Sequence, residues 1–290
     1  MNNHELARAR AEVQAIGADW ALLTSPENVT YVSHYEVPVE SGPLAQLNYG
    51  PVMALFGVEE PTTYLLANRY YAGAARQQSP FDEVIGFGIL EVFAPFVPQV
   101  ARENFVAALR QLLQQTQLGS GKTKLAVEER TLPLIAPGCP WLPIVYCKIG
   151  FPNVELVDAG AALARARMVN TEREIGLLKS TAEVVNIAHK KVIELTQQAH
   201  KSEFEIWAEL TKAMHQHVGG KLFVAGEVVC GPRNKTVSPV GPIHYAAQPG
   251  DVAEPDICPR YHGYWADMAN TMIVSAKPTP VQKKGCASGA

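Results

Sequence analysis

The sequence lacks the features that mark several common classes of protein. Its 25 Lys and Arg residues do not exceed its 28 Asp and Glu residues, so no basic excess favours a nucleic-acid partner. No uninterrupted apolar run reaches the roughly 18 residues of a membrane span, and the charged N-terminus has no apolar signal core. The 5 cysteines are odd in number and irregularly spaced, as is typical of buried thiols in a reducing compartment. We therefore expect a cytoplasmic protein without nucleic-acid or membrane partners.

Motifs for nucleotide binding and acyl transfer are also missing. The sequence has no phosphate-binding loop, no glycine-rich dinucleotide fingerprint and no nucleophile elbow. What it has is a globular composition, with 47% hydrophobic and 18% charged residues. Its 290 residues leave room for two ordinary domains, each with a sizeable core.

The first half of the chain alternates strand and helix signals. The short buried strand 20–24 and the amphipathic helix 98–118 are its clearest elements. Alternation of this kind predicts a three-layer α/β domain, which we assign to residues 1–165. This half shows no catalytic pattern, and His34 is expected to serve local packing.

From residue 166 to residue 290 the pattern changes to two long helices followed by strands, which predicts an α+β domain. Each helix opens with a capping box, Thr171–Glu174 for the first and Ser202–Glu205 for the second. His215 and His217 are two apart and point to different sides of a helix, so they cannot chelate one ion together. Structural roles are assigned to all the histidines on or beside these helices, which are His189, His200, His215 and His217.

The stretch 256–273 carries the candidate chemistry. Strand-forming residues flank the segment Arg260–Gly263, which we expect to be the turn of an antiparallel hairpin. Asp256 would then lie opposite Asp267, with β-carbons about 5 Å apart. Two carboxylates at that distance repel, so either one takes a proton or both face a cation. Hard divalent cations take carboxylate oxygens, which favours a metal site, while two solvated acids beside a turn are the alternative. Cys258, inside the hairpin, is assigned to packing.

These residues resemble the metal-binding hairpin of the pita-bread metallopeptidases, the family of Xaa-Pro aminopeptidases, prolidases and methionine aminopeptidases, whose fold the creatinases share. The segment 18–31 resembles the creatinase-type N-terminal domain, and Thr171–Lys179 resembles the first helix of the pita-bread domain. The hairpin positions that carry the resemblance are Pro249, Gly250, Asp251, Asp256, Gly263, Tyr264, Asp267, Asn270 and Thr271. The chain is thus identified as a member of the Xaa-Pro peptidase and creatinase branch, with a creatinase-type α/β domain followed by a pita-bread domain.

The resemblance implies a dinuclear site for Mn²⁺, Co²⁺ or Zn²⁺. It makes Asp256 a ligand of one ion and Asp267 a bridge between both, with a hydroxide held by the ions attacking the peptide bond. His244 resembles the family histidine that contacts the substrate, although the stretch from it to Asp256 is shorter than the peptidases lead us to expect. Peptides, among them Xaa-Pro peptides, are the implied substrates, and a homodimer is the implied assembly of the intact family member.

The chain also departs from the family pattern. The three other ligands of the implied five, one histidine and two glutamates, come from a second half-domain after the hairpin. Only Val281–Lys284 resembles the start of the next family helix. We therefore expect an incomplete, C-terminally truncated pita-bread domain with weak or no metal binding, and an inactive fragment. A creatinase-like amidinohydrolase and a non-catalytic peptide- or protein-binding member of the fold are the alternatives, and the acid pair argues against the former.

Overall fold

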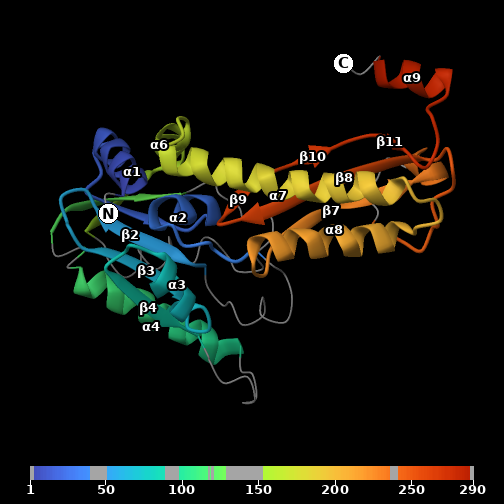
Figure 1. Ribbon diagram of the computed structural model, residues 1–290. Helices are drawn as coiled ribbons and strands as arrows, with labels where there is room; N and C mark the ends of the chain where they lie inside the picture. Colours follow the sequence, from blue (N-terminus) through green and yellow to red (C-terminus); the bar gives the residue numbers. More distant parts are fainter. Residues whose placement is uncertain are drawn as a thin grey trace. The chain divides into compact units, whose positions relative to one another are not determined.

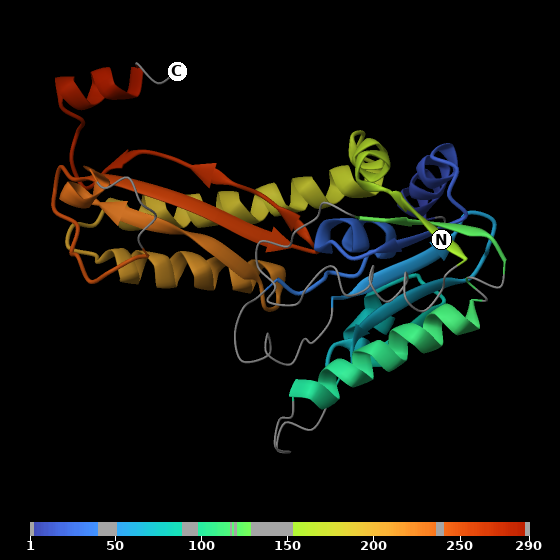
Figure 2. The same ribbon diagram turned by 180° about the vertical axis from the view of Figure 1, so that it is seen from behind.

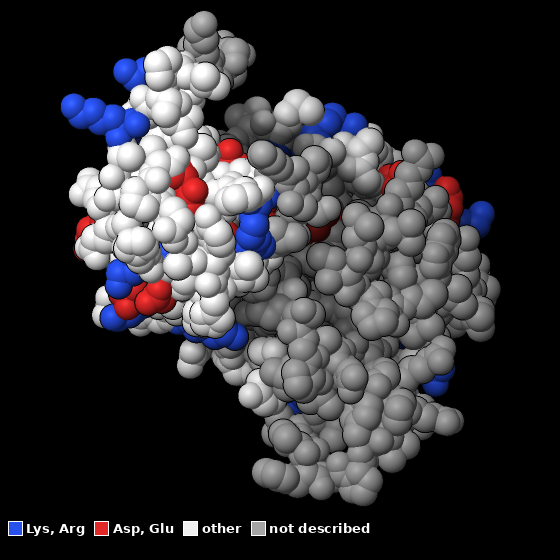
Figure 3. All heavy atoms as spheres, turned by 90° about the vertical axis from the view of Figure 1, so that its right-hand side faces the viewer, with Lys and Arg blue, Asp and Glu red and all other residues white. Residues whose placement is uncertain are grey.

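The computed structural model describes residues 3–39, 51–88, 98–116, 118, 121–128, 153–235 and 241–287. The chain divides into two compact units, Met1–Thr171 (unit 1) and Glu172–Ala290 (unit 2). The boundary at 165/166 expected from the sequence falls inside helix α6 (Gly160–Arg167). Within the described ranges, none of the helices combines the length and the apolar character that a membrane span requires. In the face shown by Figure 3, acidic and basic side chains of the described residues are interspersed without a patch of one sign.

Unit 1 is built on a mixed six-stranded sheet in the order β4-β3-β2-β1-β5-β6. Antiparallel pairing joins β1 to β2 and β2 to β3, and the remaining neighbours are parallel. The three central strands are short, almost continuous apolar runs, as strands buried on both faces should be. The strands are β1 (Trp20–Leu23), β2 (Met53–Gly57), β3 (Thr63–Asn68), β4 (Glu83–Phe87), β5 (Thr123–Val127) and β6 (Val154–Asp158).

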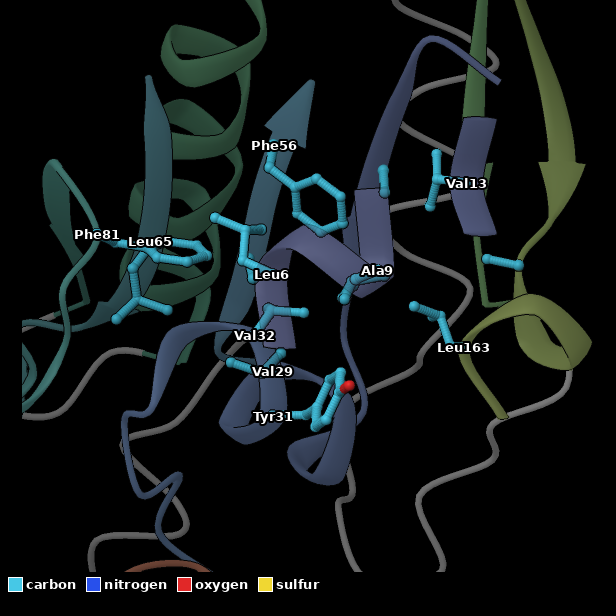
Figure 4. Close-up of a cluster of buried hydrophobic side chains, with 14 of the residues drawn as sticks. Leu6, Ala9, Val13, Val29, Tyr31, Val32, Phe56, Leu65, Phe81 and Leu163 are labelled. Atoms are coloured by element: carbon cyan, nitrogen blue, oxygen red, sulfur yellow. The ribbon is translucent and has the colours of Figure 1, made fainter. Parts of the chain in front are cut away.

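Two hydrophobic cores lie on opposite faces of this sheet, because successive strand side chains point to opposite sides. On β1, Ala21 and Leu23 join one core, whereas Leu22 joins the other. The first core packs against α1 (His4–Ala15), α2 (Pro26–Ser33), α3 (Ala72–Gln78) and α6, as Figure 4 shows for part of it. The second packs against α4 (Pro98–Gln115), which runs along the sheet in Figure 2. The predicted three-layer α/β architecture is confirmed.

Unit 2 packs two long helices, α7 (Glu172–Thr196) and α8 (Glu203–Val218), against one face of a second sheet (Figure 1). The buried positions of α7 and α8 recur at helical spacing and meet alternate residues of the strands, Ala253 and Ile257 among them. The strands are β7 (Phe223–Cys230), β8 (Val252–Tyr261), β9 (Tyr264–Trp265), β10 (Met268–Ala269) and β11 (Met272–Ile273), with a 3-10 turn η2 (Gly231–Lys235) and a helix α9 (Pro280–Ala287). Among the described elements, none covers the other face of β7 and β8, which we call the open face (Figure 2).

The strand that returns along β8 is broken into three two-residue pieces, and the sequence of β8 explains the breaks. Pro255 and Pro259 have no N–H group, so neither can donate to the residue that it faces. Ala266 donates to the Pro259 carbonyl (3.1 Å) and Asn270 to the Pro255 carbonyl (3.1 Å), without a return bond. The interruptions fall at these positions, between β9 and β10 and between β10 and β11. The hairpin is nevertheless continuous in register from Val252 to Ile273.

Candidate metal centre

The turn of the hairpin differs from the one expected from the sequence. It consists of His262 and Gly263 alone, not of the four residues 260–263, so that Tyr261 pairs with Tyr264. Both turn residues have positive φ, 49° and 86°. This combination is typical of a two-residue type I′ turn, which hairpins favour because its twist matches the right-handed twist of the strands. The histidine at the first position concealed this preference, since asparagine, aspartate or glycine is the usual signal.

The shorter turn moves the register of the hairpin by two residues. Asp256 pairs with Ala269, and by the same register Asp267 lies across from Cys258. The expected pairing of Asp256 with Asp267 is therefore wrong. The two acids nevertheless share the open face, because Asp256 and Cys258 are two residues apart on β8 and side chains along a strand have a period of two. The carboxylates are diagonal neighbours with a thiol beside both.

Three potential metal ligands converge at this place. One ligand atom from each of Asp256, Cys258 and Asp267 lies within 4.8 Å of the other two. The sulfur of Cys258 is 3.3 Å from Asp267 Oδ1 and 4.0 Å from Asp256 Oδ1. Cys258 is half-buried on the open face and lies outside the hydrophobic core, which corrects the expectation that it serves packing. Two carboxylates and a thiol are a donor set that suits a divalent ion such as Zn²⁺ or Co²⁺.

Without a cation, the cluster is electrostatically unfavourable. Burial, the Asp267 carboxylate and Glu227 all raise the pKa of Asp256. Glu227 lies on β7 directly across from Asp256, so a third acid faces the pair from the other neighbouring strand. Burial and the carboxylates of Asp267 and Asp256 raise the pKa of Cys258 to about 12. A positive ion among these groups would relieve the repulsion, and this is why the residues fit a metal.

The backbone of β7 approaches closely beside Asp256. Gly226 has φ +121°, a region that L side chains rarely adopt, and a β-carbon there would lie 2.1 Å from the Asp256 carbonyl oxygen. Only glycine therefore fits at this position.

A cavity of about 310 Å³ opens next to the cluster on the same face, with polar walls that include Glu227, Glu254, Asp256, Asn270 and Thr271. A small polar ligand or a hydrated ion therefore has room beside the acid pair.

His189 of α7 is the histidine that the structure sets against the hairpin. Its Nε2–H donates to the Met268 carbonyl (2.9 Å), and its Nδ1 accepts from the Asn270 side chain (3.1 Å). Burial lowers the pKa of His189, outweighing the Met268 carbonyl and the Asp256 carboxylate, which raise it. Both ring nitrogens are engaged, and the ring fixes Met268, the residue next to Asp267. Sequence reasoning gave it a structural role but had no signal that it touches the site, 79 residues away.

His244 does not join the donor cluster within the part of the chain that the structure describes. It is exposed, and its ring lies against Phe204 at the start of α8, with 5.2 Å between ring centroids. The backbone on either side is held by α8: Ile243 N–H donates to Glu203 Oε2 (3.1 Å), and Glu203 N–H donates to the Tyr245 carbonyl (3.1 Å). Of the three predicted site residues, the structure thus brings together Asp256 and Asp267 only.

Two family descriptions match the chain, in the order expected from the sequence. "Creatinase/Prolidase N-terminal domain" matches residues 5–169, and "Metallopeptidase family M24" matches residues 176–287. The chain therefore belongs to the creatinase/prolidase family, with that N-terminal domain followed by an M24 peptidase domain.

Known proteins agree with this assignment over nearly the whole chain. The creatinase of Bacillus sp. (strain B-0618) is 23% identical over 278 residues, covering 92% of this chain and 59% of that protein. The prolidase of Pyrococcus horikoshii OT3 has a TM-score of 0.65 at 18% identity, covering 97% of this chain and 67% of its own. The X-Pro aminopeptidase of Thermotoga maritima MSB8 has a TM-score of 0.63 at 21% identity, covering 94% and 67%. These likenesses show the fold, a creatinase-type α/β domain followed by a partial pita-bread domain, and the chain spans about three fifths of the creatinase.

Proposed function

We propose that unit 2 holds a divalent metal ion through Asp256 and Asp267, and that the chain is part of a metallopeptidase acting on Xaa-Pro peptides. The observation that carries the proposal is the convergence of two carboxylates on the open face of β8 in an M24 domain. The prolidase and the X-Pro aminopeptidase among the structural relatives suggest the substrate class. Mn²⁺, Co²⁺ and Zn²⁺ are the ions that we expect at such donors.

The residues around the cluster have distinct proposed roles. A divalent ion, when bound, supplies Lewis-acid polarisation of a carbonyl oxygen and acidifies water. Asp256 and Asp267 hold that ion, and His189 fixes the backbone next to Asp267 through its bond to Met268. His244 is the proposed substrate-contacting histidine. Its exposure leaves it free to meet a peptide, and its neighbour Ile243 is tied to the buried Glu203.

We further infer that residues 1–290 by themselves bind one ion weakly and do not turn over a peptide. The donor cluster among the described residues offers three side chains, whereas the implied two-ion centre has five ligands. Ions in oxygen-rich sites keep their affinity only when enough ligands are held in place together. The homodimer implied for the intact family member belongs to the same proposal, and gel filtration with light scattering would measure it.

Creatine hydrolysis is a second candidate, favoured by the likeness to a creatinase over 92% of the chain. The resemblance implies that this reaction needs no metal and relies on a histidine base, so a pair of acids has no role in it. Creatine hydrolysis in the presence of a chelator, unaffected by Asp267→Asn, would support this alternative against the peptidase.

The test is calorimetric titration of the purified chain with Mn²⁺, Co²⁺ and Zn²⁺, alongside hydrolysis assays with Xaa-Pro dipeptides and longer peptides. We expect one ion per chain and loss of binding in Asp267→Asn. The matched control is Glu254→Gln, which removes an exposed acid from the same face of β8 two residues from Asp256. Equal binding by the wild type and Asp267→Asn would refute the metal site. Metal-dependent cleavage by residues 1–290, abolished by Asp267→Asn, would refute the inactivity and mean that another chain or further residues complete the site.

A further inference from the structure

The structure describes the side chains of two cysteines in unit 2, and their surroundings differ sharply. Cys230 is fully buried in the hydrophobic core between the sheet and the helices. Cys258 is half-buried on the open face, with its sulfur facing two carboxylates and no apolar partner in the core. A thiol is a weak hydrogen-bond donor and gains little from such a position in the absence of a cation. The contrast calls for a role for Cys258 other than packing.

The backbone geometry of the hairpin sets this position. Cys258 follows Asp256 by two residues on β8 and lies across from Asp267, so it occupies the corner that joins the two acids. For metal bonds of 2.0–2.3 Å and angles of about 90–110°, neighbouring ligand atoms lie about 3.0–3.7 Å apart. The separation of 3.3 Å between the sulfur and Asp267 Oδ1 falls inside this range, and the 4.0 Å to Asp256 Oδ1 needs only a small contraction.

We propose that Cys258 is a third ligand of the ion held by Asp256 and Asp267, and that its sulfur biases the site toward Zn²⁺ or Co²⁺ over Mn²⁺. The inference rests on the proposed function, which supplies the ion. The M24 family match, which is independent of the geometry, is what points to a metal at this hairpin. Soft thiolate donors select zinc-like ions, whereas carboxylates alone suit Mn²⁺ as well.

The binding step has a simple balance. The thiol S–H bond breaks, a sulfur–metal bond forms, and the proton passes to solvent or buffer, with no change of oxidation state. One proton per ion is therefore released at this ligand, in addition to any proton displaced from the acid pair. Zn²⁺ binding should consequently become tighter as pH rises, more steeply in the wild type than in Cys258→Ser.

The experiment uses the full 290-residue chain, reduced and free of oxygen, titrated with Co²⁺, Zn²⁺ and Mn²⁺. Co²⁺ bound to a thiolate gives a sulfur-to-metal charge-transfer band in the near ultraviolet, which carboxylate binding alone does not give. We expect this band in the wild type, its loss in Cys258→Ser, and its retention in Cys230→Ala, where the thiol removed lies in the core. The ratio of Zn²⁺ to Mn²⁺ affinity should fall by about tenfold or more in Cys258→Ser.

Two other results separate the inference from the proposed function. Binding of Co²⁺ that Asp267→Asn abolishes but that shows no charge-transfer band, and is unchanged in Cys258→Ser, would overturn the role of Cys258 and leave the acid pair as the metal site. Failure of every ion to bind the wild type would overturn both. Equal thermal unfolding of the wild type and Cys258→Ser in chelator excludes misfolding as the cause of a lost band.

Discussion

Asp267 lies across the hairpin from Cys258, with its Oδ1 atom 3.3 Å from the sulfur. The two-residue turn at His262–Gly263 sets this register, and the bond from Ala266 N–H to the Pro259 carbonyl continues it. Because hydrogen-bonded and non-hydrogen-bonded pairs alternate, Cys258 and Asp267 form a non-hydrogen-bonded pair, whose α-carbons lie about 4.5 Å apart. This is the closer of the two kinds of cross-strand pair, and it brings the side chains into contact.

The register predicts a cross-link. In Asp267→Cys the new thiol should form a disulfide with Cys258, because α-carbons about 4.4–6.8 Å apart allow one. Closing this short loop should raise the free energy of unfolding by about 2–3 kcal/mol. Ala269→Cys is the control: residue 269 faces Asp256, so it is a diagonal neighbour of Cys258 about 7–8 Å away. Peptide mapping after mild oxidation measures both, and a cross-link in Ala269→Cys with none in Asp267→Cys would show that the register is different.

His189 is expected to act on the metal site through the backbone. Removing it in His189→Ala frees the Met268 carbonyl and the Asn270 side chain, and so loosens the residue beside Asp267. We expect metal affinity to fall by about 10–100-fold, as for other groups that orient ligands without touching the ion. Calorimetric titration measures this fall.

The control for His189→Ala is His215→Ala. His215 lies on α8, and its Nε2 bonds to the Leu222 carbonyl (3.2 Å). The contact is of the same kind, but Leu222 is not adjacent in the chain to any of the three donor residues. Each substitution should lower the free energy of unfolding by about 1–3 kcal/mol. An equal loss of metal affinity in both variants would mean that His189 acts only through general stability.

Local patterns predicted much of this molecule. The capping box at Ser202 is present with both of its bonds, 2.7 Å from Ser202 N–H to Glu205 Oε2 and 3.2 Å from Glu205 N–H to the serine hydroxyl. The placement of Asp256 and Asp267 on one face survived an error of two residues in register, because a side-chain period of two makes such an error harmless to the choice of face. The assignment of strand residues to one face of a sheet is therefore unaffected by an error of an even number of residues in register.

What the sequence did not reveal depends on contacts between distant segments or on a local conformation without its usual residue. The type I′ turn needs positive φ at His262, where no glycine or asparagine announces it. The approach of His189 to Met268 follows from the packing of α7 on the sheet, which no spacing along the chain encodes. The place of Cys258 in the cluster follows from the register, so the misplaced turn also concealed the thiol as a third donor.

Glu203 is expected to be the most important single charge of unit 2 for stability. Its carboxylate is fully buried at the start of α8, accepts from Cys230 N–H (2.7 Å) and Ile243 N–H (3.1 Å), and pairs with Arg233. Glu203→Ala should cost about 3–5 kcal/mol in urea denaturation, because it leaves the guanidinium, the buried Cys230 N–H and the half-buried Ile243 N–H without their partner. It should also release the segment that carries His244.

The control for Glu203→Ala is Glu209→Ala on the same helix. Glu209 forms an exposed pair with Lys212 (3.4 Å), and its loss should change stability by no more than about 0.5 kcal/mol. If the two substitutions cost the same, the buried network around Glu203 contributes no more than a surface ion pair, and the expectation is wrong.

In unit 1, Glu5 should make stability depend on pH in the acid range. Burial raises the pKa of this carboxyl, but bonds from the Thr171 hydroxyl, its own backbone N–H and His34 outweigh burial and hold the pKa below the ordinary value of 4.5. A folded-state pKa below the unfolded value means stability that is present above about pH 4.5 and is lost as pH falls through the folded pKa. Glu5→Gln should therefore lower the free energy of unfolding by about 1–3 kcal/mol at pH 7 and by progressively less as pH falls. Urea denaturation between roughly pH 7 and pH 3 measures the difference.

The matched control is Glu12→Gln. It removes a carboxylate that Arg165 contacts at 2.8 Å on the more exposed side of α1. If the free energy of unfolding differs between wild type and Glu5→Gln by the same amount across this pH range, the ionisation of Glu5 does not contribute to stability and the expectation is wrong.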